Sequence, residues 1–533
     1  MNIFEEYKDK VLTIIKKAEK DKLLILPEKL NGINVDSTPP NINFDVSTNV
    51  SMVLSKANNK SPNIIAETII DLLKKEDTHI KEISFSKPGF INIKFNKDYW
   101  NSFANKLINI SYKYGSSNKD KKKYLVEFVS ANPTGPLHVG HCRGAILGDV
   151  ISNILKFNNN IVEKEYYVND YGNQIKKLIT SILSKIDKDY QSDEDDLYKG
   201  EYIQTIATKI QKKIKGVGDF NIQREIILDE MFKIINIPIH NLNIDFDNWF
   251  YESSLFKDDL VEKNIKKLEN SGHIIKDNGA LMLRAEEPRV LVKSNGDYTY
   301  FATDLAYHDL KIKNFDLVID IWGADHHGYV PRIKAGLRAL GHDVNKLDIH
   351  LIQFANLFRN GEKVSMSTRK GEFIELESLR KEIGNDAINF FYLTKSKDQH
   401  LDFDLSVAIE QNKNNPVFYV QYAHARIEKI LNEAKGYESN AYNIESLDNK
   451  LEKEIITTLI NFNEVLKKSL TELQPHLITH YLVKLSQDFH SYYANVKILD
   501  EDIDYSRIHL IAAVQKILKC GLDLLNINAP KEM

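Results

Sequence analysis

Two histidines three positions apart carry the clearest chemical signal of the sequence. His138 and His141 enclose Val139 and Gly140 in the stretch SANPTGPLHVGH, residues 130–141. If a helix begins here, its first turn places both imidazoles on one side. Gly140 has no side chain and would let a nucleotide approach the backbone closely. Two hydrogen-bond donors beside a helix start suit a phosphoryl group that gains negative charge during a reaction.

The pattern around these histidines predicts a strand, a tight loop and a helix. Residues 124–129 are a short apolar run of strand formers, residues 131–135 contain breakers, and apolar residues recur at helical spacing from His138 onward. In an open parallel sheet this junction lies at the carboxyl edge, where a helix N-terminus offers unpaired N–H groups. Neither GxGxxG nor GxxxxGK[ST] occurs here, so an anion must be bound without those glycine-rich loops.

Two other interpretations of the histidines remain open. They could be ordinary residues at a helix start, or they could belong to a zinc site. The side chains that could be recruited for zinc are His138, His141, Cys142, His326 and His327. The paired CxxC and HExxH patterns typical of zinc sites are absent, so we expect no metal bound by the protein.

The stretch resembles the HIGH signature of class I aminoacyl-tRNA synthetases, with Val139 in the isoleucine place. The preceding VEFVSANPTGPL, residues 126–137, is similar to arginyl-tRNA synthetases in particular. The resemblance implies that His138, Gly140 and His141 are catalytic. It implies ATP contacts by Pro133, Thr134, Gly135, Leu137, His138, Val139, Gly140, His141, Gly323, Asp325, His326, Met366 and Ser367.

The second signature of class I synthetases, usually Lys-Met-Ser-Lys-Ser, corresponds to SMSTRKG at residues 365–371. Met366 and Ser367 match, but Ser365 and Thr368 stand where the two lysines belong. Nearby cations must therefore neutralise the leaving pyrophosphate together with Mg²⁺. The candidates are Lys370 and Arg369, with Lys123 as a further candidate if its strand carries it to the same edge of the sheet.

Arginine as the implied substrate makes a physical demand on the pocket. A guanidinium is a planar, permanently charged fork of donors, best met by carboxylates and an aromatic face. Glu127 and Asp304 could supply the carboxylates. Tyr300 and Asp304 are four apart and can face one way where a strand leads into a helix. The resemblance places both at the arginine side chain, and Ser130, Asn132 and His141 near its other end.

Glu127 lies on a predicted apolar strand, where a buried carboxylate without a cation is expensive. It therefore needs a partner, and a bound guanidinium could be that partner. The alternatives are a structural ion pair for Glu127 and a helix N-cap role for Asp304. A pocket with two buried carboxylates would reject lysine, ornithine and citrulline, so a separate editing domain should be unnecessary.

The bulk properties describe a globular chain of several domains. The 533 residues contain 42% hydrophobic and 27% charged residues, with a formal net charge of −4. This charge does not indicate a general nucleic-acid binder, so RNA contacts would depend on local patches, and we expect no DNA binding. Two cysteines, no export signal and no membrane-spanning segment predict a cytoplasmic protein.

We predict a multidomain α/β architecture with three parts. An N-terminal α+β domain covers residues 1–115, a Rossmann-like catalytic domain with a parallel sheet covers 116–385, and an insertion occupies about 180–290. From residue 386 to 533 the chain reads as an all-α bundle, and its segment PVFYVQYAHARI resembles the anticodon-binding domain of arginyl-tRNA synthetases. The N-terminal domain resembles the additional domain that contacts the tRNA elbow.

Local patterns predict particular elements within these parts. Apolar residues recur at helical spacing over residues 4–18, which predicts an amphipathic first helix. Asn278-Gly279 and Asn295-Gly296 are two-residue turn signals, and the second lies between the predicted strands VLVKS and YTYFATD. Residues 351–358 predict a further strand, and Pro416 suits the start of a helix.

The resemblance implies a monomeric enzyme that joins L-arginine to tRNA(Arg) with ATP and Mg²⁺. Three rivals remain: a class I synthetase for lysine, a nucleotidyltransferase with the same HxGH loop, and a tRNA-binding scaffold whose site has decayed. The large helical part after Asp386 disfavours the nucleotidyltransferase, and an acidic pocket disfavours apolar amino acids. The irregular SMSTRKG is the best support for the scaffold.

Overall fold

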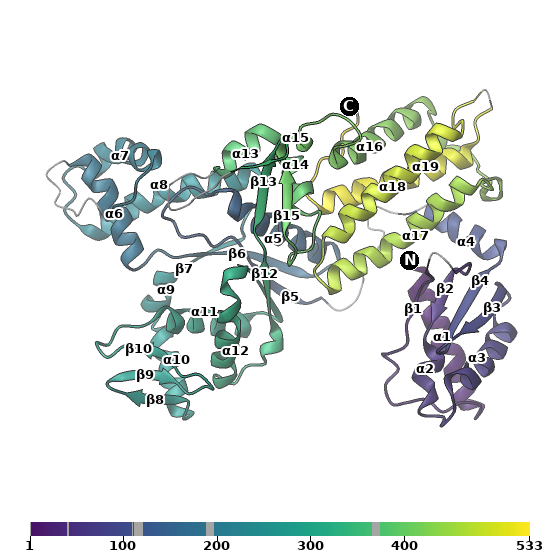
Figure 1. Cartoon of the computed structure of the whole chain (residues 1–533), viewed down its shortest axis with the longest axis horizontal. Helices are drawn as coiled ribbons and strands as arrows, with labels where there is room; N and C mark the ends of the chain where they lie inside the picture. Colours follow the sequence, from purple (N-terminus) through teal and green to yellow (C-terminus); the bar gives the residue numbers. More distant parts are fainter. Residues whose placement is uncertain are drawn as a thin grey trace.

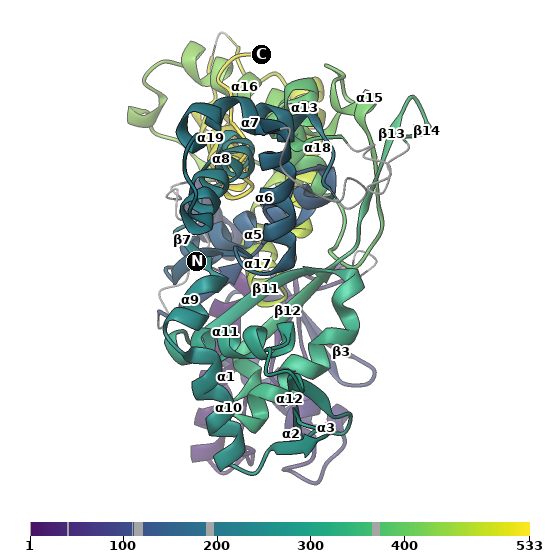
Figure 2. The ribbon, with the colours of Figure 1, turned by 90° about the vertical axis from the view of Figure 1, so that its left-hand side faces the viewer.

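The chain folds into an elongated molecule with a central sheet, an N-terminal α+β domain and a C-terminal helical bundle (Figure 1). The view turned by 90° shows the N-terminal domain behind the central sheet (Figure 2). The computed structural model describes residues 2–39, 42–108, 110, 121–187, 197–364, 374–500 and 502–533.

The N-terminal domain is an antiparallel sheet of order β1-β2-β4-β3, covered by helices. Its elements are α1 (Ile3–Lys20), β1 (Val35–Ser37), β2 (Val46–Thr48), α2 (Val50–Ser55), α3 (Pro62–Glu76), β3 (Ile80–Ser86), β4 (Phe90–Phe95) and α4 (Lys97–Ile108). The predicted amphipathic first helix is confirmed, because its periodic apolar residues are buried. The short β1 and α2 were not predicted, since three to six residues carry too little periodicity.

The central sheet has five strands in the order β12-β11-β5-β6-β7, and all neighbours are parallel. The strands are β5 (Lys123–Glu127), β6 (Ile161–Val168), β7 (Asn248–Tyr251), β11 (Leu317–Gly323) and β12 (Leu347–Ile352). The chain runs outward from β5 to β7 and then returns to the other side of β5 with β11. The order therefore reverses between β5 and β11, and a crevice at the carboxyl ends of these two strands is the favoured ligand site of such sheets.

Helices cover both faces of this sheet. Leu125 and Val126 are adjacent in β5 and fully buried, but they pack into two different apolar clusters. This follows from the alternation of side chains along a strand. The helix after β5 belongs to one cluster, and the two helices around β11 belong to the other: α5 (Val139–Phe157), α11 (Tyr300–Asn314) and α12 (Val330–Ala339).

A helical insertion separates β6 from β7, and a small antiparallel sheet precedes α11. Their elements are α6 (Asn173–Ile186), α7 (Glu201–Ile214), α8 (Phe220–Asn241), α9 (Glu252–Lys257), α10 (Leu260–Asn270), β8 (Ile274–Asp277), β9 (Ala280–Leu283) and β10 (Arg289–Val292). The predicted Asn278-Gly279 turn joins β8 to β9. The strand predicted for YTYFATD is limited to its first residue, Tyr298, which pairs antiparallel with Val292. The rest is helical, because the hydroxyl of Thr299 accepts a hydrogen bond from the Ala302 N–H and starts α11 there.

Two further predictions need correction in the stretch that follows β12. The single strand predicted for residues 351–358 is in fact the end of β12 and most of a second strand, β13. The predominantly helical chain predicted from Asp386 is interrupted by β15, which pairs in parallel with β13 and thereby gains a partner that local periodicity does not show. The elements here are β13 (Ala355–Arg359), β14 (Glu362–Lys363), α13 (Leu376–Ile383), α14 (Asn385–Tyr392), β15 (Leu401–Asp404) and α15 (Leu405–Ala408).

The C-terminal bundle contains α16 (Pro416–Glu433), α17 (Lys450–Thr471), α18 (His476–Asn495) and α19 (Tyr505–Leu524). Pro416 occupies the first position of α16, as predicted, and Asn415 caps that helix. The bundle packs against α4 of the N-terminal domain and against α5 of the catalytic part. Beyond α19, the Asn526 amide donates to the Asp149 carboxylate of α5 at 3.3 Å. The helix that follows the histidine loop thus supports the bundle.

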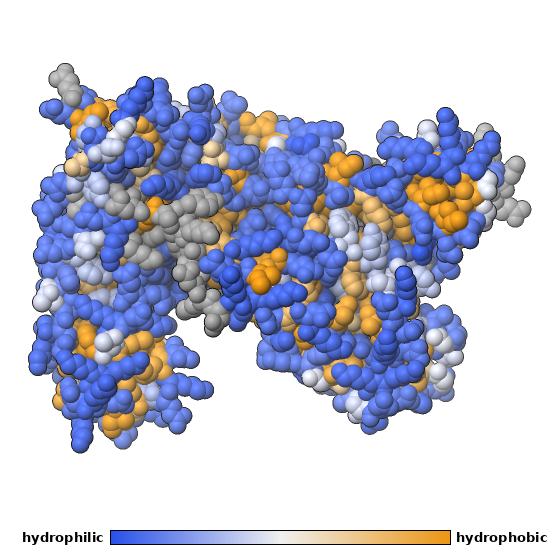
Figure 3. Space-filling view, turned by 180° about the vertical axis from the view of Figure 1, so that it is seen from behind, coloured by the Kyte–Doolittle hydropathy of each residue, from blue (hydrophilic) through white to orange (hydrophobic). Residues whose placement is uncertain are grey.

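The surface seen from behind is mostly hydrophilic, with apolar groups on the insertion helices and the N-terminal domain (Figure 3). The large exposed apolar side chains of these two parts are Phe220, Ile222 and Ile237, and Leu23, Ile25, Ile64, Phe85 and Phe90. Among the described residues, no helix is long and apolar enough to cross a membrane.

Gly148 is required where α5 crosses the end of β5. A Cβ added there would lie 2.2 Å from Cγ of the Phe128 ring, which is fully buried. We expect Gly148→Ala to lower the free energy of unfolding of the catalytic part by about 1–3 kcal/mol, because the ring has no room to move. Scanning calorimetry checks this. Gly218→Ala is the matched control, since its added Cβ meets nothing within 4 Å, and equal melting temperatures for the two variants would contradict the prediction.

Candidate active site

The loop after β5 leaves the sheet through a strained turn. Val129 and Ser130 both have positive φ angles, 69° and 41°, which are unfavourable for residues other than glycine. The turn is held by Ser130, whose Oγ donates to Glu127 Oε1 at 2.8 Å and accepts from the Tyr167 N–H at 3.1 Å. Strain of this kind persists only where the surroundings hold it, and it marks functional sites.

Two tyrosines hold the backbone of the loop between this turn and α5. The Tyr166 hydroxyl donates to the carbonyl of Ala131 at 2.9 Å, and the Tyr202 hydroxyl donates to the carbonyl of Thr134 at 2.6 Å. Tyr166 lies on β6, whereas Tyr202 lies on α7 of the insertion. The insertion therefore helps to shape the loop.

His138 and His141 form a capping box at the start of α5. The Gly140 N–H donates to His138 Nδ1 at 3.1 Å, and the His138 N–H donates to His141 Nδ1 at 3.2 Å. The ring centroids are 4.0 Å apart, as the spacing predicted. Burial lowers the pKa of His138, and burial together with His138 lowers the pKa of His141 to about 4. Both rings are therefore neutral near pH 7, and because each Nδ1 accepts, each proton lies on Nε2.

Gly140 has a second reason to be glycine. A Cβ at this position would lie 2.8 Å from the His138 ring. The space beside Gly140, which was predicted to admit a nucleotide, holds the imidazole of the capping box in this structure. The other loop residues predicted to contact ATP, Pro133, Gly135, Leu137 and Val139, are buried or half-buried.

The segment that follows the second signature is tied to the histidine loop. The Val139 N–H donates to the Ile374 carbonyl at 3.0 Å, and the Leu376 N–H donates to the Leu137 carbonyl at 2.9 Å. His138 and Glu375 pair between these two bonds. The predicted residues of the signature itself, Met366, Ser367, Arg369 and Lys370, lie outside the described residues.

Five of the six residues predicted to bind arginine line one cavity of about 320 Å³, whereas the sixth, His141, is not among its lining residues. The five are Glu127, Ser130, Asn132, Tyr300 and Asp304. Gly323 and His326, predicted to contact ATP, line the same cavity from the end of β11, whereas Asp325 is exposed beside His326. The cavity lies at the carboxyl ends of β5 and β11, where the strand order reverses.

Glu252 is a wall residue that the sequence did not reveal. Its side chain comes from α9, is 4% exposed, and shares the cavity with Asp304. Burial and the nearby Asp304 raise the pKa of Glu252 to about 7, and burial also raises the pKa of Asp304. No lysine or arginine is among the described side chains that line the cavity. Asp304 and Glu252 thus face a space without a lysine or arginine. Four tyrosines also line the cavity: Tyr167, Tyr300, Tyr307 and Tyr329.

Glu127 does have the cationic partner that a buried carboxylate requires, but the partner belongs to the chain. Lys311 Nζ lies 2.5 Å from Glu127 Oε2 and 2.6 Å from Asp320 Oδ1, and all three side chains are buried. The structural ion pair, which had been the alternative for this residue, is therefore present. The alternative N-cap role for Asp304 is wrong, because Thr299 caps α11.

Lys123 is far from the cavity, which corrects its prediction as a catalytic cation. It is the first residue of β5, whereas the histidine loop follows the last, and a five-residue strand separates its ends by about 13 Å. Its ammonium lies 4.2 Å from the centre of the Phe315 ring, at the amino edge of the sheet. The strand carries Lys123 away from the site because a parallel sheet collects only the carboxyl ends of its strands at the ligand edge.

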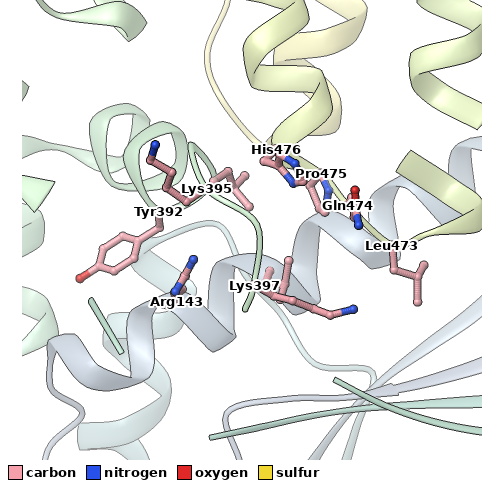
Figure 4. A pocket seen from close by; sticks show the side chains of 10 residues that line it. Arg143, Tyr392, Lys395, Lys397, Leu473, Gln474, Pro475 and His476 are labelled. Atoms are coloured by element: carbon pink, nitrogen blue, oxygen red, sulfur yellow. The ribbon is translucent and has the colours of Figure 1, made fainter. Parts of the chain in front are cut away.

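A second, much smaller cavity of about 10 Å³ lies between α5, the chain after α14 and the start of α18 (Figure 4). It contains none of the predicted site residues. Arg143 at its wall donates to three carbonyls, those of Gln353, Ser396 and Gln399, at 2.7–2.8 Å. This arginine therefore has a structural role, fastening the chain before β15 to α5.

Among the described residues, no group of three or more histidine, cysteine, aspartate or glutamate side chains is arranged to hold a metal ion. Cys142, considered as a zinc ligand, is buried next to Tyr392, and burial raises the pKa of its thiol to about 12. A protonated thiol is a poor metal ligand.

Comparison with known proteins gives matches along almost the whole chain. Three family models match: the arginyl tRNA synthetase N terminal domain at residues 5–95, the catalytic domain of class I (R) tRNA synthetases at 104–411, and the DALR anticodon binding domain at 420–533. The chain is 42% identical to the arginine–tRNA ligase of Pelagibacter ubique, covering 100% of both chains, and 37% identical to that of Coxiella burnetii, covering 99% of both.

The solved structure of Thermus thermophilus arginyl-tRNA synthetase superposes with a TM-score of 0.77 at 20% identity and covers 100% of both chains, which supports the fold. The predicted fold class is confirmed: along the chain, an N-terminal domain is followed by a catalytic domain with a parallel sheet and then by a helical anticodon-binding domain. The chain belongs to the arginyl-tRNA synthetases of class I.

Proposed function

We propose that this protein is an arginine–tRNA ligase that works in two steps. In the first step, a carboxylate oxygen of L-arginine attacks the α-phosphorus of ATP, the bond to pyrophosphate breaks, and arginyl-adenylate forms. In the second step, a hydroxyl of the 3′-terminal ribose of tRNA(Arg) attacks the carbonyl carbon and AMP leaves. The observation that carries the proposal is an acidic, tyrosine-lined cavity that lies at the same sheet edge as two neutral imidazoles.

The cavity suits a guanidinium. Asp304 and Glu252 are carboxylates without a lysine or arginine partner in the wall, and a bound guanidinium can donate to both at once. Tyr300 is 65% exposed at the entrance and offers a ring face. Glu127 also lines the cavity and is held by Lys311, while Ser130 and Asn132 at the loop end of the cavity suit the α-amino group.

The histidine loop suits the phosphoryl transfer. His138 and His141 are neutral and each carries its proton on Nε2, so both can donate to oxygens on the α-phosphorus as negative charge develops there. Mg²⁺ would enter with ATP and shield the pyrophosphate, together with Lys370 or Arg369 of the second signature. The described flank of that signature pairs with residues 137–139, which supports a position near the phosphates.

The remaining parts suit tRNA. The helices α16–α19 match an anticodon-binding domain. The N-terminal domain, whose surface exposes Phe85 and Phe90, would contact the tRNA elbow. We infer a monomeric, cytoplasmic enzyme, with a division near residues 115 and 410. The second value replaces 386, because β15 ends at Asp404 and belongs with β13.

Exchange of labelled pyrophosphate into ATP tests the function. It is measured with arginine, lysine or citrulline, each with and without tRNA(Arg). We expect exchange with arginine only. Exchange with lysine alone would favour a lysine enzyme, and absence of exchange with every amino acid in the presence of tRNA would favour a non-catalytic tRNA-binding protein.

Arginine binding should weaken as the pH falls below about 7. Burial and the neighbouring Asp304 raise the pKa of Glu252 to about 7 in the empty cavity, so this group is a neutral acid below that pH and a carboxylate above it. Only the carboxylate attracts the guanidinium. We therefore expect kcat/KM for arginine to fall with decreasing pH, up to about tenfold per pH unit, from an inflection near pH 7.

The pH profile from 5.5 to 8.5, measured with saturating ATP and tRNA, checks this expectation. In Glu252→Gln the inflection should disappear while the overall value falls. An inflection that persists in this variant would assign it to another group.

A further inference from the structure

Lys311 is a buried cation that the proposed reaction does not use directly. It is 2% exposed, and its ammonium contacts Glu127, Asp320 and the face of the Tyr307 ring, 4.3 Å from the ring centre. It lies below the cavity and is not part of its wall. Although burial opposes its charge, Asp320, Glu127 and Glu165 raise the pKa of Lys311, so the ammonium stays charged.

The ammonium is joined to the substrate cavity along one face of α11. Asp304, His308 and Lys311 are spaced four and three residues apart, so they share that face. His308 Nδ1 lies 2.7 Å from the Asp304 carbonyl, and His308 Nε2 lies 2.9 Å from Asp320 Oδ2. Asp320 therefore links the imidazole and the ammonium, and the position of α11 relative to β11 is fixed beneath the cavity.

On its other side, Lys311 is joined to the strained turn. It binds one oxygen of Glu127, and the other oxygen accepts from the Ser130 hydroxyl. Val129 and Ser130 keep positive φ angles, which residues with side chains adopt only where their contacts enforce them. The histidine loop begins directly after this turn, so the orientation of the Glu127 carboxylate affects where the loop leaves the sheet.

We propose that Lys311 is a positioning residue for the activation step: it fixes the Glu127 carboxylate, which holds Ser130 and the turn that leads into the histidine loop. The inference rests on the proposed function and adds a residue that touches neither arginine nor ATP. It gives one ammonium two effects. Lys311 compensates part of the charge of Glu127, because it is shared with Asp320, and it aligns the loop with the bound arginine.

The test is Lys311→Met in the full chain, with Lys313→Met as the matched control. Lys313 lies on the same helix, but its side chain is 49% exposed and pairs with Asp309. In Lys311→Met we expect pyrophosphate exchange per competent site to fall about 100-fold, because a displacement of about 1 Å in the reacting geometry costs that much. The KM for arginine should not rise, since Asp304 and Glu252 remain. The control should match the wild type in both quantities.

Competent sites are counted by the amplitude of a single-turnover transfer of arginine to tRNA. A purely structural role of Lys311 gives fewer sites that each react at the normal rate, and this result would overturn the inference. Unchanged exchange in Lys311→Met would overturn it as well. Failure of the wild type to exchange with arginine would instead reject the proposed function.

Two milder variants keep the test decisive if Lys311→Met does not fold. Lys311→Arg retains the charge and should recover most of the exchange rate. Glu127→Gln retains an oxygen acceptor for Ser130 and the Lys311–Asp320 pair but weakens the hold on the turn, so its rate per site should fall by less than that of Lys311→Met. A wild-type rate in Glu127→Gln would contradict the role assigned to Lys311.

Discussion

Replacing His138 with asparagine should reduce pyrophosphate exchange about 100- to 1000-fold while arginine affinity stays nearly constant. The reduction is that expected when one donor to a developing oxyanion is removed. Asparagine is a favourable N-cap, so its side-chain oxygen can replace His138 Nδ1 as acceptor of the helix N–H hydrogen bond. Its shorter side chain does not reach the position of the histidine Nε2–H donor. The variant thus removes the hydrogen-bond donor to the phosphoryl group while it keeps the helix cap.

His138→Ala is the companion variant. It should lose the donor and also about 1 kcal/mol of helix stability, because the cap is removed. Exchange kinetics and thermal unfolding of the two variants measured together distinguish the contributions. If the asparagine variant exchanges at the wild-type rate, the histidine serves only the helix.

The second large effect is expected at Asp304. Asp304→Asn should lower kcat/KM for arginine by at least about 30-fold, because loss of one partner in a buried charge pair costs 2–5 kcal/mol or more. The asparagine keeps the shape of the side chain but turns an amide N–H towards a ligand that has only donors. The KM for ATP should change little, since ATP is expected to bind at the histidine loop.

Asp297→Asn provides the control, because this carboxylate lies in the turn after β10, bound to the Asn295 amide, and does not line the cavity. A rise in the KM for ATP equal to that for arginine in Asp304→Asn would show general damage to the site. Better use of citrulline than of arginine by this variant would be an additional sign that charge is what the cavity selects.

The parts of the site that sequence could predict are those whose chemistry is local. His138 and His141 were predicted because a three-residue spacing at a helix start fixes their relation, whatever lies around them. Tyr300 and Asp304 are four apart and were predicted to face one way. They lie in the helix α11 and not in the predicted strand, but residues four apart also share one face of a helix, so the predicted pairing still holds.

The site predictions that failed depend on which end of a strand faces the ligand and on contacts between residues distant in the sequence. Lys123 was assigned to the wrong edge because residue spacing says how far a side chain lies along a strand and not which end faces the ligand. The local sequence YESSLF does not indicate a role for Glu252, because its role depends on its proximity to Asp304 in the folded cavity. Lys311 could have been found, because Asp304, His308 and Lys311 form a polar stripe on a helix whose other buried residues are mostly apolar.

The hydrogen bond from Tyr202 to the loop carbonyl has a consequence for protein engineering. A truncated catalytic core designed from the strand pattern would delete the insertion between β6 and β7 as a dispensable module and continue the cut through α9. That deletion would remove the hydroxyl that fixes Thr134 and the carboxylate of Glu252 together. A minimal enzyme of this fold must therefore keep α7 and α9, and any shortening of the chain has to be made elsewhere.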